Sequence, residues 1–445
     1  MASYIPPSVI VQGDRNTGAT TDYMQPSTIC IVGRMDKYPA KQTSRVLANG
    51  ATATITAPNV LADTIELTAY DGTKLVKDTD YTQTTDSDEQ TFSITITKAG
   101  LKTQSILIQY QYVPDNFFEP LKWYTKASIA DFYGEAFDEQ HYIASPLTAA
   151  AQYAFDNGAS TVCIVPVMDS QVYTTKKYPT QTLEQALEKL KLQDDIAIVV
   201  PINMEPADLQ TVREHITWCN AHACERRGIF GLDGVQHTYS VEDLMEVQRN
   251  LDSDAVLFTP NTIAPVYVSD ARTTVNLPGW LYAAAIAGVA ITLPLYRSLT
   301  RQNLAGFYGV QGYLVEERNI LAQAGGCVIE MVNGNIRIRH SLTTFQNQQL
   351  DWSYRGVYNY IVRSMRDLFD PYIGQPSSRV VLAQIDSLAD SFLEQLVERS
   401  MIYGYSDLEV ARRNGNPSIV DVTFRYSYLA PMLWIYVNFS VDMDY

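Results

Sequence analysis

The stretch SPLTAAAQYAFDNGASTVCIVPV, residues 145–167, indicates the fold of this chain. Its first half begins with Ser-Pro and carries small and apolar residues at helical spacing. Its second half is a short, uncharged run that is rich in β-branched residues. A continuous apolar strand that follows a helix is typical of a parallel sheet covered by helices on both faces. The stretch therefore predicts one helix–strand unit of an α/β domain.

The same alternation recurs three times downstream. Helical patterns at 182–192, 206–227 and 241–251 each lead into an apolar strand, at 196–202, 228–234 and 254–260. A further strand, STICIVGRM, lies at 27–35, upstream of a segment with a different composition. Repeated helix–strand units predict a parallel α/β core. We assign this core to residues 26–44 and 114–330.

Three further regions surround this core in the 445-residue chain. Residues 1–25 read as an extended arm with a polar linker. Residues 45–113 contain short Thr-rich alternating runs such as ATATITA and TFSITIT, which predict an inserted β-sandwich-like domain. Residues 331–445 predict a C-terminal α+β domain: a hairpin at Asn333-Gly334, helices at 351–370 and 385–402, and two terminal strands.

Composition excludes several classes of protein. Apolar residues make up 46% of the chain and charged residues 18%, which suits a folded core and not a disordered chain. The net charge of −16 argues against binding to a nucleic-acid backbone. Five scattered cysteines and an N-terminus without a signal-peptide pattern indicate reduced thiols in a cytoplasmic product. The uncharged segment 273–296 predicts a packed interior helix and no membrane insertion.

Residues capable of chemistry are sparse. No glycine-rich phosphate loop and no nucleophile elbow follow the strands. His215, Cys219 and His222 share one face of a predicted helix, with Cys224 and Glu225 close by, so a metal site is one interpretation and packing on the sheet is the other. Two carboxylates near strand ends, Asp233 and Asp254, suit capping and loop roles. We therefore assign no catalytic, cofactor-binding or metal residue and expect no cofactor.

Three arginines, Arg355, Arg363 and Arg366, lie on one predicted helix. Arg355 and Arg366 are spaced to share a face, and Arg363 lies to one side. A solvated face is one interpretation, and a docking surface is the other.

The last two predicted strands each have one apolar face, with Phe424 and Tyr426 in the first. The second carries Leu433, Ile435, Val437, Phe439 and Val441. The arm adds a third short run around Val9, Ile10 and Val11. A two-stranded ribbon is marginal in water, so these strands need partners. Spacing alone leaves two alternatives open: pairing within the chain, or exchange between subunits.

Several motifs, in order, resemble tail sheath proteins of contractile phage tails and related injection systems. They are ICIVGRMDKYP, KASIADFYGEAF, SPLTAAAQYAFDNGASTVCIVPV, ERRGIFGLDG with VLFTPNTIAP, GGCVIEMVNGNIRIRHSLTT and YSYLAPMLWIYVNFS. The resemblance covers nearly the whole chain except 45–115, which would be a variable outer insertion. The arm departs from it, since YIPPSVIVQ stands where the family often has P-G-V-Y-V.

The resemblance implies a non-enzymatic, mechanical role in the virion. Subunits of this family stack as hexameric rings around an inner tube, in a metastable extended state, and shorten on triggering to bring about genome ejection and host cell entry. Implied partners are further copies, the tube protein, and baseplate and tail terminator proteins, assembled in the host cytoplasm. Exchange of the terminal strands between neighbours is implied too. Separately, the polar, glycine-bearing linkers at 13–22 and 412–418 have the composition of hinges. If the three arginines form a docking surface, we expect that surface to face the tube.

Two alternatives remain. One is an α/β metal-dependent hydrolase that uses the cluster at 215–225. The other is a different virion structural protein, such as a tube or capsid protein, although the α/β middle argues against a tube protein.

Overall fold

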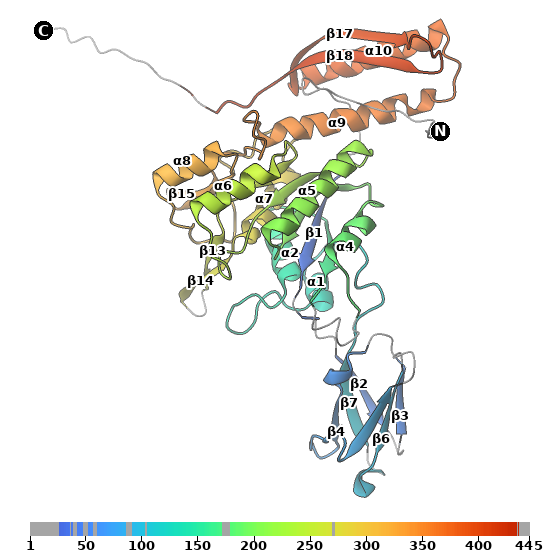
Figure 1. Cartoon of the computed structure of the whole chain (residues 1–445), viewed down its shortest axis with the longest axis vertical. Helices are drawn as coiled ribbons and strands as arrows, with labels where there is room; N and C mark the ends of the chain where they lie inside the picture. Colours follow the sequence, from blue (N-terminus) through green and yellow to red (C-terminus); the bar gives the residue numbers. More distant parts are fainter. Residues whose placement is uncertain are drawn as a thin grey trace, which may run out of the picture.

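The computed structural model describes residues 26–35, 37–38, 42–47, 52–56, 60–85, 91–102, 105–170, 179–268, 272–433 and 435. Figure 1 shows three parts arranged along the long axis of the molecule. An α/β body occupies the middle, a small β domain lies at one end, and a layer built from the C-terminal helices and strands lies at the other.

A six-stranded sheet forms the centre of the α/β body. Its strands, in spatial order, are β12 (Val256–Phe258), β11 (Arg227–Phe230), β10 (Ile196–Ile202), β1 (Thr28–Arg34), β9 (Val162–Val167) and β8 (Leu121–Trp123). All neighbours pair in parallel except β8, which is antiparallel to β9. The predicted mixed α/β fold with a parallel sheet is confirmed.

Helices cover both faces of this sheet because its strands are apolar on both sides. Ile29 and Ile31 of β1 point into one core, whereas Cys30 and Val32 point into the other. The first core is covered by α1 (Lys126–Tyr133), α2 (Pro146–Asp156) and α7 (Trp280–Thr292). The second is covered by α4 (Leu183–Leu190), α5 (Pro206–Ala221), α6 (Val241–Leu251) and α8 (Val315–Gln323).

Helix α7 forms the middle of the uncharged segment 273–296, and the first six residues of that segment form the strand Thr273–Pro278. The helix crosses α2 so closely that a Cβ atom on Gly288 would lie 2.3 Å from the carbonyl oxygen of Ala154. Ten of its residues are buried. None of the helices in the described part of the chain has the length and hydropathy of a bilayer-crossing segment. The burial of these ten residues accounts for the apolar composition of α7.

The inserted β domain consists of two three-stranded antiparallel sheets. They are β2 (Gln42–Leu47), β7 (Ile106–Gln111) and β4 (Glu66–Ala69), and β3 (Thr52–Thr56), β6 (Thr91–Ile96) and β5 (Tyr81–Thr85), with short 3₁₀ turns at Ala62–Thr64 and Ala99–Leu101. Leu67, Phe92 and Ile108 belong to a core of its own. Strand β2 starts before the predicted boundary at 45, and Gln42 pairs with Gln111, so the chain enters and leaves this domain at adjacent points.

Two hairpins extend the α/β body. The first pairs β13 (Ile263–Val268) with β14 (Thr273–Pro278), and the second pairs β15 (Ile329–Val332) with β16 (Asn335–Ile338). The second turns at Asn333-Gly334 as predicted, with positive φ at both residues. Ile329 and Ile336 lie in the core of the α/β body, so this hairpin packs there although the predicted boundary at 330 cuts through it.

The C-terminal layer contains two helices and one hairpin. These are α9 (Trp352–Phe369), followed by a 3₁₀ turn at Asp370–Tyr372, α10 (Arg379–Glu398), β17 (Ile402–Arg412) and β18 (Val420–Tyr428). Strand β17 was not predicted, and the second helix, predicted at 385–402, ends at Glu398. Residues 412–418, predicted as a hinge, belong largely to the loop that joins β17 to β18, and their role as a hinge stays a prediction. The other predicted hinge, 13–22, lies outside the described residues.

Candidate assembly surface

Strand β18 buries its apolar side within its own chain. Val422, Phe424 and Tyr426 pack against the core that α9 and α10 form, while Thr423, Arg425 and Ser427 between them are exposed. Burial raises the pKa of the Tyr426 hydroxyl above its ordinary value. The predicted alternation of apolar and polar residues in this strand is confirmed. Tyr426 is a buried core residue of the C-terminal layer, and Phe424 is partly buried against that core. Any exchange with another subunit through β18 would therefore use its backbone edge.

The β17–β18 hairpin is a sheet of two strands, and among the described residues no third strand joins it. Its register shifts twice along β17, and Asp407 at the second irregularity has a φ of 55°. Irregularities of this kind bend a strand and break ladder pairing locally. A sheet needs three or more strands, or packing on a helix, to be stable, so this hairpin depends on its packing against α10. Its backbone edges can accept further strands.

The chain continues past β18 without regular structure over the residues that are described. Met432 and Ile435 are 78% and 75% exposed, and Leu433 is half-buried. The predicted final strand is thus not formed at these positions within a single chain. Val9, Ile10, Val11, Val437, Phe439 and Val441 lie outside the described residues, so strand exchange through them stays a prediction.

A polar network joins the end of β18 to the α/β body. The Tyr428 hydroxyl lies 2.6 Å from the Ser353 Oγ in α9, and this Oγ donates to Asp351 Oδ1 at 2.5 Å. The second carboxylate oxygen of Asp351 accepts from Ser298 and Ser341 of the body, each at 2.7 Å. Sequence reasoning missed this network, although Asp351 directly before a helix was a recognisable cap signal.

The three arginines of α9 are paired inside the chain. Arg355 lies 3.2 Å from Asp254, whereas Arg363 and Arg366 both bind Glu225, at 3.3 and 2.5 Å. Glu225 is almost fully buried, with a side-chain exposure of 1%. Thus Arg363, expected off to one side, shares a carboxylate with Arg366. These contacts attach α9 to the body, and contact with a tube stays a prediction.

The side chains proposed as a metal site lie in different surroundings. His215 is buried and lies 3.0 Å from the Arg226 guanidinium and 3.4 Å from Cys219. Burial and the Arg226 charge lower the pKa of His215 to about 3, and burial raises the pKa of Cys219 to about 11. His222 is exposed and stacks on Trp218. No group of three potential metal ligands occurs among the described residues. The contacts fit the packing interpretation.

Carboxylates at the strand ends have structural partners. Asp233 accepts hydrogen bonds from the backbone N–H groups of Val235 and Gln236, at 2.8 and 3.1 Å, which closes a turn. Asp254 pairs with Arg355, as described above. The loop role expected for Asp233 fits these contacts, whereas the ion pair of Asp254 with a residue 101 positions away was not predicted.

Comparison by sequence finds a phage relative. The chain is 28% identical over 344 residues to the tail sheath protein of Mycobacterium phage Bxz1, a match that covers 76% of this chain. The match spans 58% of the length of that relative. No family model matches the chain.

Comparison by fold finds sheath proteins of contractile injection systems. The helical sheath of the anti-feeding prophage in its contracted state aligns with a TM-score of 0.58 at 11% identity, covering 99% of this chain and 100% of the other. The sheath complex of the extracellular injection system PVC, also contracted, aligns with a TM-score of 0.58 at 9% identity and covers 99% of both chains. These proteins are named as sheath components and not as enzymes. The resemblance to tail sheath proteins is therefore confirmed, by sequence for a phage protein and by fold for injection-system sheaths.

Proposed function

We propose that the chain is a structural subunit of a contractile tail sheath. In this role it polymerises as stacked hexameric rings around an inner tube, in a metastable extended state, and shortens to drive the tube through the host envelope. The observation that carries the proposal is the sequence similarity to a phage tail sheath protein over 344 residues. The matching fold, which covers 99% of the chain, supports it.

Assembly in this proposal uses the C-terminal layer. The β17–β18 hairpin accepts strands from neighbouring subunits at its free backbone edges. Donors are the segment around Val9–Val11 and the segment from Leu433 to Val441 of other copies. The exposed side chains of Met432 and Ile435 support this, because exposed apolar residues gain from burial in an interface. Tube, baseplate and terminator proteins are the further proposed partners, within a virion assembled in the host cytoplasm.

Electron microscopy of two purified chains tests this proposal. The full chain should form hollow cylinders, alone or with its tube protein. A chain that ends at Ala430 keeps all described helices and strands, so it should remain folded but should no longer polymerise. Cylinders from the shortened chain would contradict the donor role of the last segment. A full chain that stays monomeric with its tube protein would contradict the sheath function.

A further inference from the structure

A cavity of about 540 Å³ lies between the α/β body and the C-terminal layer. One wall is the end of α7 and the loop after it, from Ile291 to Tyr296, and the opposite wall is α9 with Asn359 and Arg363. Pro26 and Ser27, where the described chain begins, close one side. Ligand sites in proteins commonly have ~300–1,000 Å³. The cavity is large enough for a side chain or a small molecule.

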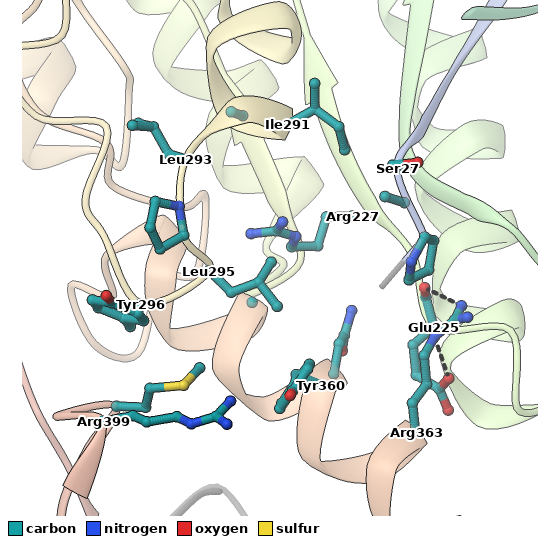
Figure 2. A pocket seen from close by; sticks show the side chains of 17 residues that line it. Ser27, Glu225, Arg227, Ile291, Leu293, Leu295, Tyr296, Tyr360, Arg363 and Arg399 are labelled. Atoms are coloured by element: carbon teal, nitrogen blue, oxygen red, sulfur yellow. Dashed lines mark hydrogen bonds and ion pairs between the residues drawn. The ribbon is translucent and has the colours of Figure 1, made fainter. Parts of the chain in front are cut away.

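Arg227 of β11 reaches into this cavity, as Figure 2 shows. The residue is only 4% exposed. Its guanidinium lies 4.2 Å from the centre of the Trp352 ring, and its hydrogen bond to the Trp352 carbonyl oxygen is long, at 3.5 Å. Within the described part of the chain, no carboxylate lies within ion-pair distance of Arg227, in contrast to the neighbouring arginines of α9.

The surroundings of Arg227 favour an anion. Burial and the charge of Arg355 lower the pKa of Arg227 to about 9, and no carboxylate among the described residues pairs with its guanidinium. Glu225, the one carboxylate among the described lining residues, is already neutralised by Arg363 and Arg366. A buried charge is stable when a counter-charge and hydrogen bonds compensate it. The cavity wall offers further donors in the Ser27 hydroxyl and the Asn359 amide.

We propose that this cavity is a receptor for a carboxylate or a similar small oxyanion, held by the guanidinium of Arg227. A planar guanidinium binds such groups through two parallel hydrogen bonds. An occupant would contact β11 and α9 together, so it would fasten the C-terminal layer to the α/β body. This inference does not depend on the proposed sheath function.

Two sources can supply the oxyanion. The first is the chain itself, because Asp22 precedes Pro26 by only four residues. Four extended residues span at most ~13–14 Å, and Pro26 lines the cavity. The second source is a small anion from solution, such as phosphate or acetate.

Thermal unfolding of the full chain, titrated with phosphate or acetate at constant ionic strength, distinguishes these sources. Wild type is compared with Asp22→Asn, Arg227→Gln and the double variant, and Arg249→Gln on the exposed face of α6 is the control. If Asp22 fills the site, Asp22→Asn lowers the unfolding midpoint only when Arg227 is present. The unfolding midpoint of Asp22→Asn then rises with added anion, whereas the midpoint of wild type does not. If solution anions fill it, wild type itself responds and Asp22→Asn behaves like wild type.

In both cases Arg227→Gln should abolish the shift of the unfolding midpoint with added anion, and Arg249→Gln should leave that shift unchanged. Should Arg227→Gln fail to fold, Arg227→Lys keeps the charge but loses the paired hydrogen bonds, and should bind anion ~10-fold more weakly. Two results together would overturn the proposal. In the first, added anion shifts the unfolding midpoints of wild type, Asp22→Asn and the Arg227 variants equally. In the second, Asp22→Asn has the same effect on the midpoint whether or not Arg227 is present.

Discussion

The hydroxyl of Tyr428, the last residue of β18, lies 2.6 Å from the Oγ of Ser353 in the first turn of α9. This contact joins the end of the terminal hairpin to the Asp351 network of the α/β body. Tyr428→Phe should lower the free energy of unfolding by about 1 kcal/mol, because one partly buried hydrogen bond is lost. Ser353→Ala combined with Tyr428→Phe should cost less than the sum of the two single changes. Tyr403→Phe, at a tyrosine that is 76% exposed, is the control. Additive effects in chemical denaturation would show that the contact contributes nothing.

Glu225 should be one of the most sensitive positions in the α9 interface. Its buried carboxylate holds both Arg363 and Arg366. Glu225→Gln should lower the free energy of unfolding by about 3 kcal/mol or more, because two partly buried cations lose their partner. Glu119→Gln breaks an exposed pair with Lys189, so it should cost less than about 1 kcal/mol. Equal effects of both changes in urea denaturation would contradict the buried-pair account.

The same pairing affects how a tube contact of the arginines can be tested. Reversing the charge of Arg366 would place two carboxylates together and destabilise the fold itself. The neutral pair Glu225→Gln with Arg366→Gln avoids this repulsion. If Arg366 binds a tube, the double variant should co-assemble with it less well than Glu225→Gln alone, measured by co-sedimentation. If the double variant and Glu225→Gln co-assemble with the tube equally well, Arg366 does not contact the tube and acts only within its own chain.

His215 should make the stability depend on pH. Its pKa is about 3 in the folded chain, below the ordinary value of 6.5, so the folded state binds fewer protons than the unfolded state between these values. The contribution of neutral His215 to the free energy of unfolding is therefore complete above about pH 6.5. As the pH falls below that value, this contribution is lost by ~1.4 kcal/mol per pH unit. His215→Gln should flatten the decrease between pH 7 and 5, measured by urea denaturation. His222→Gln should keep the wild-type slope because His215 is still present, and an unchanged slope in His215→Gln would contradict this account.

The inserted β domain should be separable from the rest of the chain. Its strands share a core of their own, and its two connections meet where Gln42 pairs with Gln111. Replacing residues 42–112 with a short Gly/Ser linker should leave a folded α/β body, at the loss of Leu61, which packs into that body. Residues 42–112 alone should give a cooperative thermal transition in circular dichroism. An unfolded remainder after the replacement would show that the domain is integral to the body.

An element could be predicted from the sequence where its own residues show which of its faces are buried. Strands β1, β9 and β10 are apolar on both faces and are therefore recognisable as buried parallel strands. Strand β17 escaped detection because Gly404 and Asp407 interrupt its alternation at two bulges. The arginines of α9 were placed on the right helix, but their partners Glu225 and Asp254 lie more than 100 residues away. Spacing along a helix cannot reveal such partners. The Asp351 network was missed for the same reason, since Ser298, Ser341 and Tyr428 come together only in the fold.

A cryo-electron-microscopy map of the polymer formed by the full chain would test the central claim most directly. The account predicts a hollow helical assembly in which the β17–β18 hairpin of each subunit is extended by strands from neighbouring subunits. One of these strands should contain residues 433–441 of another copy. A polymer in which the hairpin keeps only its own two strands would contradict the strand-exchange account. Particles that never form a hollow assembly, even with the tube protein, would contradict the sheath function.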